Sequence, residues 1–273
     1  MKYGKYEECP IENVLQIDSV FTWFRQKFAD DYMYSGESHD FYEVVCVISG
    51  TVGVTAGKNV LMLPAGRMIV HEPNEFHNIW AAEGEPEVLI CSFNASKFPC
   101  GSGVFTLLPD EVSELCDIYG DTEGCFDRSR DALRVAEGKA AQASATVKRL
   151  ERVLISIISA RRMGKSGIDD GSARTYRNIV SEMEKNVTKP LTTQSIAALC
   201  NISVSALEKT VRRFAGTGAM ELFACMKLKC ACKLLEQGSS VKDVAFSLGY
   251  SNPYYFSAVF KKRLGVTPSK WNR

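Results

Sequence analysis

Residues 249–271 read GYSNPYYFSAVFKKRLGVTPSKW, and this stretch decides the fold of the C-terminal part of the chain. Asn252 precedes Pro253, a pair that suits the N-cap and the first turn of a helix. Gly265 is a residue type that commonly ends helices. The stretch therefore predicts a helix over 253–264, with one buried face made by Phe256, Val259 and Phe260.

A second helix is expected directly before this one. Ser240 and Asp243 are spaced as in a capping box, in which the hydroxyl accepts a hydrogen bond from a backbone N–H of the first turn. The helix should cover 241–247, and Leu-Gly-Tyr-Ser (248–251) should form a tight turn. Together the two helices predict a helix-turn-helix unit.

The same pattern occurs once before, in LTTQSIAALCNISVSALEKTVRRFAG (191–216). Thr192 or Thr193 can cap its first helix and Ser203 its second. A longer helix over 218–236 should join the two units, with a buried stripe of Phe223, Met226, Cys230 and Leu234. The chain therefore contains two candidate helix-turn-helix units.

Charge is unevenly distributed along the chain. Residues 172–273 contain 16 Lys and Arg but 6 Asp and Glu, whereas residues 1–171 contain 17 and 26, so a net charge of +10 follows one of −9. A positive balance of this size on a short segment indicates an anionic partner such as the DNA backbone. A merely solvated basic surface is the alternative.

The outward faces of the two second helices carry side chains suited to the major groove of DNA. Tyr254 and Ser257 can bond to base edges, and Ala258 can touch a thymine methyl group. Glu208 can accept a hydrogen bond from a cytosine amino group. The expected phosphate contacts, which set register rather than specificity, are Arg212, Arg213, Asn252, Lys261 and Lys262.

These residues also resemble a known family. The string over 249–271 is similar to the C-terminal signature of AraC/XylS-type transcription regulators, and the similarity extends over about 172–273. The resemblance implies two helix-turn-helix units, joined by a long helix, that enter successive segments of the major groove. It implies base-reading roles for Ser205, Glu208, Lys209, Tyr254, Ser257 and Ala258. The sequence departs from the family at Val211, where phenylalanine is usual, and at Ala258, where a longer side chain is common.

The N-terminal part of the chain reads as short strands followed by helices. Apolar and β-branched runs, separated by turn residues, predict strands over 41–50, 51–55, 67–71 and 86–93. Such a series is typical of a β-sandwich or a small barrel. Helices are expected over 109–119 and, as one or two elements, over about 128–162.

A group of polar residues in this region resembles the cupin barrels, which are also common at the N-terminus of AraC-type regulators. His39 and Glu43 stand at the cupin spacing, and His77 follows in the second motif. Phe41 occupies the place where metal-binding cupins usually have a second histidine, so neither a metal nor another cofactor is expected. Instead, we expect an effector pocket made of His39, Phe41, Glu43, His77 and Trp80.

The expected fold class is a two-domain α+β chain. A cupin-like β-barrel with trailing helices should cover 1–165, a linker rich in Gly, Ser and Asp 166–173, and an all-α double helix-turn-helix domain 174–273. The apolar stripe Val147–Ile158 has two interpretations: it packs on the barrel, or it pairs with its copy in a homodimer.

The expected function is that of a cytoplasmic transcription regulator without enzymatic activity. Double-stranded DNA and a small-molecule effector, for which the family favours a sugar, are the expected partners, and RNA polymerase is a possible one. A homodimer is also expected, and no membrane partner. One alternative is a metal-dependent cupin enzyme, using His39, Glu43 and His77, fused to a DNA-binding domain. The other is a constitutive DNA binder with a structural N-terminal domain.

Overall fold

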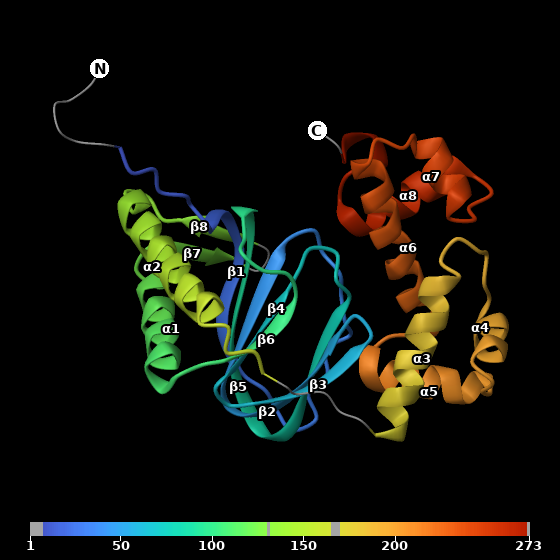
Figure 1. Cartoon of the computed structure of the whole chain (residues 1–273), viewed down its shortest axis with the longest axis horizontal. Coiled ribbons are helices and arrows are strands. Elements are labelled where there is room, and N and C mark those ends of the chain that lie inside the picture. The colour runs from blue at the N-terminus through green and yellow to red at the C-terminus, as the bar shows by residue number, and fades with distance from the viewer. Residues whose placement is uncertain (1–7, 130–131, 165–169, 272–273) are drawn as a thin grey trace.

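The computed structural model describes residues 8–129, 132–164 and 170–271. It contains a sheet-rich N-terminal domain that leads into an all-helical C-terminal domain, and the two domains lie side by side (Figure 1). Among the described residues, no helix combines the length and the apolar character that crossing a membrane requires.

The N-terminal domain is built on a six-stranded sheet in which all pairs are antiparallel. Its strands follow the order β1-β5-β2-β4-β6, and β3 pairs with the second half of β2, from Thr51 to Ala56. Their bounds are β1 Gln16–Lys27, β2 Tyr42–Ala56, β3 Asn59–Pro64, β4 Arg67–His71, β5 His77–Lys97 and β6 Gly103–Thr106.

The first half of strand β2 is buried on both of its faces, which explains the apolar run Val44–Ile48. Val44 and Cys46 belong to the core cluster beneath the helices, whereas Val45 and Val47 belong to a second cluster on the other face. The two strands predicted over 41–50 and 51–55 are one strand. Gly50 does not end it, because the chain continues through irregular register at Ser49–Val52 and still pairs with β5.

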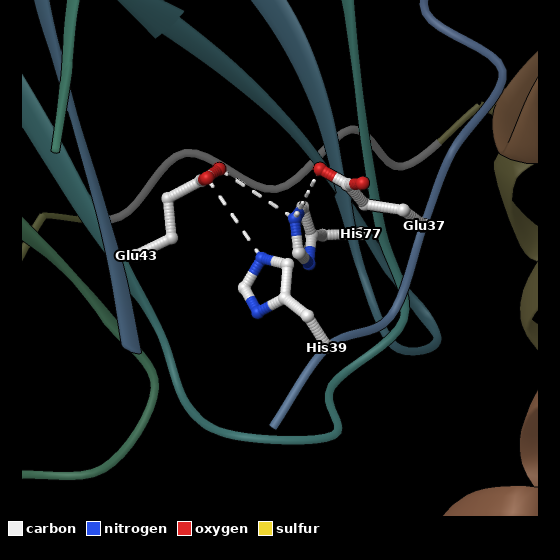
Figure 2. A group of neighbouring side chains, drawn as sticks. All are labelled: Glu37, His39, Glu43 and His77. Atoms are coloured by element: carbon white, nitrogen blue, oxygen red, sulfur yellow. Dashed lines mark ion pairs between the residues drawn. The ribbon is translucent and has the colours of Figure 1, made fainter. Parts of the chain in front are cut away.

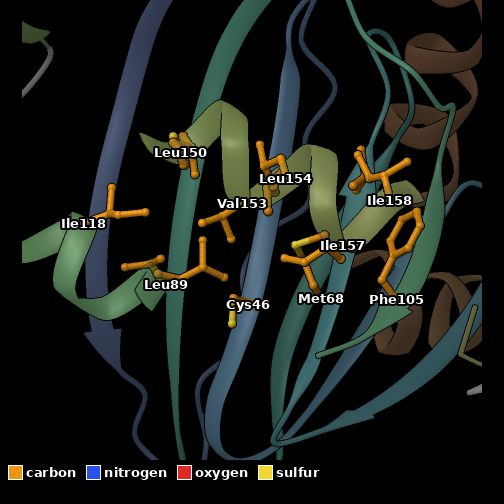
Figure 3. Packing of buried hydrophobic residues seen from close by; sticks show 14 of the residues in the cluster. Cys46, Met68, Leu89, Phe105, Ile118, Leu150, Val153, Leu154, Ile157 and Ile158 are labelled. Carbon is orange, nitrogen blue, oxygen red and sulfur yellow. The ribbon is translucent and has the colours of Figure 1, made fainter. Parts of the chain in front are cut away.

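Two helices cover one face of this sheet: α1 (Pro109–Thr122) and α2 (Ala140–Ser159). The apolar side chains of α2 contact Leu89 and Met68 of the sheet (Figure 3). The stripe Val147–Ile158 therefore packs on the sheet, which is the first of its two interpretations. Its buried residues there are Leu150, Val153, Leu154, Ile157 and Ile158.

The helix expected to start near residue 128 starts only at Ala140. Before it, β7 (Phe126–Ser129) and β8 (Ala132–Val135) form a two-stranded antiparallel sheet. This part of the prediction is wrong because Phe126 is buried, with its ring 6.4 Å from that of Trp23. That tertiary contact outweighs the weak local preference for helix.

The C-terminal domain is entirely helical within the described residues. Its helices are α3 Gly171–Lys185, α4 Thr193–Leu199, α5 Val204–Ala215, α6 Ala219–Glu236, α7 Val241–Ser247 and α8 Pro253–Leu264. The predicted caps are present: the side chains of Thr192, Ser203, Ser240 and Asn252 each accept a hydrogen bond from a backbone N–H of the helix that follows. Of the expected linker, 166–169 lie outside the described residues, and Gly171–Ala173 form the first turn of α3.

The buried face of α6 differs from the expected stripe. Phe223 is buried, but Met226, Cys230 and Leu234 are only partly so, because α6 contacts both helix-turn-helix units and turns a wider face inward. That face includes Lys227, which is only 8% exposed. Its ammonium group donates to three backbone carbonyls, those of Val187, Lys189 and Leu248, which belong to the turns before α4 and after α7.

Replacing Lys227 with methionine should therefore loosen the joint between the two units. The aliphatic stem is kept, but three carbonyl oxygens lose their donor, which should lower the free energy of unfolding by about 1–3 kcal/mol. Urea unfolding of the full chain measures this. Lys229→Met is the matched control, because Lys229 lies on the exposed side of the same helix and makes one ion pair, 3.8 Å from Glu72. Equal losses in both variants would show that the three carbonyl contacts contribute little.

Candidate DNA interface and effector cavity

Helices α5 and α8 are the second helices of the two units, and each buries one side. Leu207, Val211 and Phe214 of α5 are at most 1% exposed, as are Phe256 and Phe260 of α8. Val211, the departure from the family pattern, fits into the core of the first unit. Val259 is only half-buried, although it was expected to face inward.

The opposite sides of both helices are open to solvent. Tyr254 is 86% exposed. The other exposed residues among those predicted to contact DNA are Ser205, Lys209, Arg212, Arg213, Asn252, Ala258, Lys261 and Lys262. Each helix therefore presents a polar surface outside its unit, as insertion into a groove requires.

Several predicted contact residues already have partners within the chain. The carboxylate of Glu208 lies 3.4 Å from the N–H of Ala219 and 3.8 Å from Arg212, and it is half-buried. The hydroxyl of Ser257 donates to the carbonyl of Pro253 over 2.9 Å. Arg213 donates to the hydroxyl of Ser172 over 3.1 Å. These side chains would have to exchange internal partners for DNA contacts.

The sheet domain encloses a cavity of about 540 Å³. Its lining includes the aromatic rings of Phe24, Phe28, Tyr32 and Phe41. It also includes Glu37, Glu43 and three histidines, His39, His71 and His77. A cavity with apolar walls and a few convergent polar groups is the usual form of a small-molecule site.

Four of the five predicted pocket residues line this cavity, namely His39, Phe41, Glu43 and His77, but Trp80 does not. The indole of Trp80 lies flat on β2 at Gly53, in the space that a Cβ atom would fill. Its ring is 6.2 Å from that of Phe214 in α5, so it belongs to the boundary between the two domains.

Four of the residues that line the cavity, Glu37, His39, Glu43 and His77, form a polar cluster (Figure 2). The Nε2 atoms of His39 and His77 lie 3.8 Å and 3.5 Å from the carboxylate oxygens of Glu43. Glu37 was missed from the sequence, although it stands two residues before His39 and therefore on the same side of an extended segment.

Burial controls the charge of these groups. It lowers the pKa of His77 to about 3, so that this imidazole is neutral near pH 7. Burial also raises the pKa of the Glu37 carboxyl. At Glu43 burial acts in the same direction, but the neighbouring histidines outweigh it and hold the pKa below its usual range, so that Glu43 is a carboxylate.

The end of α5 is joined to the sheet domain. Thr55 of β2 and Asn78 of β5 both donate to the carbonyl of Phe214. Gly216, the C-cap of α5, has a φ of 66°, and a Cβ atom there would collide with the carbonyl oxygen of Tyr34. Val60 and Phe76 of the sheet domain are part of the core cluster of the first helix-turn-helix unit.

The fold and these surfaces define a two-domain protein, with a ligand-sized cavity in a sheet and two helix-turn-helix units in a basic helical domain. The family described as "AraC-like ligand binding domain" matches residues 20–115, and the family described as "Helix-turn-helix domain" matches residues 196–273. The two parts of the chain are therefore similar to an AraC-like ligand-binding domain and to a helix-turn-helix domain, respectively.

Relatives are similar over different shares of the chain. The transcriptional activator RhaS of Escherichia fergusonii is 22% identical over 84% of each chain. The regulator GlxA of Rhizobium meliloti is 30% identical, but over 35% of this chain and 30% of its own length. The matched regions cover less than half of GlxA, AdaA of Bacillus subtilis and the MmsAB regulatory protein of Pseudomonas aeruginosa. Among solved structures, ToxT of Vibrio cholerae aligns over 93% of this chain at 13% identity, with a TM-score of 0.39.

Adding a methyl group at Gly216 should disturb the contact between the domains. Gly265 is the matched control, because it ends α8 as Gly216 ends α5, with a φ of 74°, but has no atom within 4 Å of an added Cβ. Gly265→Ala should cost about 1–2 kcal/mol of stability from the left-handed backbone alone. Gly216→Ala should cost more and should accelerate limited proteolysis between the domains. Equal effects of both variants would argue against the Tyr34 contact.

Proposed function

We propose that this protein is a DNA-binding transcription regulator, with α5 and α8 as its two recognition helices and a small molecule in the sheet cavity as its effector. The observation that carries the proposal is the pair of capped second helices, each with a buried apolar side and an exposed polar side, in a segment with a net charge of +10. The relatives RhaS and GlxA are both HTH-type transcriptional regulators, which supports the same class.

The contact at Phe214 supplies a route from effector to DNA. Asn78 lines the cavity and also donates to the carbonyl of Phe214, at the end of recognition helix α5. A ligand that moves Asn78 would therefore change how α5 is held against the sheet. For such a ligand to regulate DNA binding, its affinity must differ between the two positions that α5 takes against the sheet, before and after Asn78 moves.

The cavity favours a polar small molecule with an apolar face, because its lining contains both aromatic rings and charged groups. A sugar, which the family resemblance favours, fits this description. The proposal also includes a homodimer and a contact with RNA polymerase, because the same family resemblance favours both. The stripe of α2 is engaged with the sheet, so such a dimer would use another surface.

Selection of bound sequences from a random DNA pool, with the full chain at fixed salt, tests DNA recognition directly. We expect an enriched motif with two short contacted blocks about one helical turn apart, because two recognition helices read successive groove segments. Binding that depends on salt but enriches no sequence would contradict sequence-specific recognition.

Two substitutions on α8 should separate specificity from affinity. Lys261→Ala should weaken binding almost evenly across DNA sequences and reduce the salt slope by about one, because a phosphate contact releases one counterion. Tyr254→Ala should instead change which bases are preferred in the half of the motif read by α8. Titrations of matched and mismatched sites at several salt concentrations measure both quantities. An unchanged preference in Tyr254→Ala would show that this residue does not read bases.

A further inference from the structure

The guanidinium of Arg213, at the end of α5, is engaged by the first residues of α3, and the two helices pack side by side (Figure 1). Its Nη1 atom donates to the hydroxyl of Ser172 over 3.1 Å, and its Nη2 atom lies 3.8 Å from the Oδ2 atom of Asp170. Two terminal nitrogens therefore face two different oxygens. The planar fork of an arginine binds the oxygens of a phosphate in the same way.

The carboxylate of Asp170 has one oxygen more than its role at the start of α3 requires. Asp170 is the N-cap of this helix, and its Oδ1 atom accepts a hydrogen bond of 2.6 Å from the N–H of Ala173. A single oxygen is enough for a cap, so an uncharged residue caps a helix equally well. Helices α4, α5, α7 and α8 have such uncharged caps, namely Thr192, Ser203, Ser240 and Asn252. The second oxygen of Asp170 is thus left for Arg213.

The segment that joins the domains, residues 162–170, is attached at both of its ends. At its start, the N–H of Thr106 in β6 donates to the carbonyl of Arg162 over 2.8 Å. The N–H of Gly164 donates to the carbonyl of Val104, also over 2.8 Å. At its end, Asp170 faces α5. The joining segment therefore connects the edge of the sheet to a proposed recognition helix.

We propose that Asp170 and Ser172 are an internal substitute for a DNA phosphate at Arg213, which DNA must displace in order to bind this residue. The inference rests on the proposed function, because it takes Arg213 as a contact to the DNA backbone. An arginine donates through one planar fork, so a phosphate and the start of α3 compete for the same nitrogens. The contact lowers the affinity for DNA, and bound DNA in turn releases the end of the joining segment from α5.

The exposure of the pair fits a contact that DNA can displace. The side chains of Arg213 and Asp170 are 56% and 47% exposed. Ion pairs between side chains this exposed are weak and are screened by salt. The contact should therefore change the affinity for DNA by a small factor, and this factor should be largest at low salt.

Asp170→Asn removes the charge and keeps a residue that caps helices equally well. The full chain with this substitution should bind a DNA duplex of mixed sequence about two- to fivefold more tightly at low salt, because an exposed ion pair is worth this much. The gain should shrink as salt is added. Ser172→Ala should give a smaller gain in the same direction. Fluorescence anisotropy of a labelled duplex measures each affinity.

Two arginine variants separate this contact from simple repulsion between Asp170 and DNA. In Arg213→Gln protein, Asp170→Asn should give no further gain. In Arg212→Gln protein the full gain should remain, since Arg212 is the neighbouring residue of α5 but pairs with Glu208, at 3.8 Å. Equal gains in both backgrounds would show that the charge acts without Arg213 and would overturn the proposal. So would the absence of any gain from Asp170→Asn alone.

The duplex of mixed sequence keeps this test apart from that of the proposed function. Phosphates are the same on every sequence, so no operator is needed to measure a contact with the backbone. Failure to enrich a DNA motif would count against sequence-specific recognition only, and the comparison of the two arginine backgrounds would still decide the role of Asp170. A chain that binds no duplex even at low salt would overturn both.

Discussion

The position of the first helix-turn-helix unit depends on the carbonyl of Phe214, which accepts hydrogen bonds from Thr55 and Asn78 of the sheet. The last carbonyls of a helix have no partner within the helix, and burial without a donor is costly. The sheet domain supplies both donors, and the left-handed backbone at Gly216 lets the chain pass close to Tyr34. The end of a proposed recognition helix is thus held by the domain that contains the cavity.

The cavity and this joint are neighbours because of the geometry of β5. His77 and Asn78 are adjacent in β5 and both line the cavity; His77 belongs to the polar cluster, and Asn78 also donates to the carbonyl of Phe214 in α5. The polar cluster is itself held from several directions: Glu43 comes from β2, and Glu37 pairs through its backbone with His77. A change at the cluster therefore has a short path, through adjacent residues of one strand, to the DNA-binding domain.

The helical domain could be predicted well because its signals are local. A cap such as Ser203 or Asn252 bonds to a backbone group two or three residues further on, so the sequence of a few residues is enough to place the start of a helix. The sheet domain was predicted less completely. Strands β1, β3 and β6 were not expected, and residues from about 128 to 135 were assigned to a helix, because strand pairing joins residues far apart in the chain.

The sequence by itself determined the two repeated units, their caps, the charge difference between the halves and the presence of His39, Phe41, Glu43 and His77 at the cavity. Only the tertiary structure shows that Glu37 lies beside them, that Trp80 lies at the domain boundary and that Lys227 is buried between the two units. The reason is the range of the interactions. Caps and periodicity act within one or two helical turns, whereas a buried charge or a shared cavity depends on which distant backbone groups meet around it.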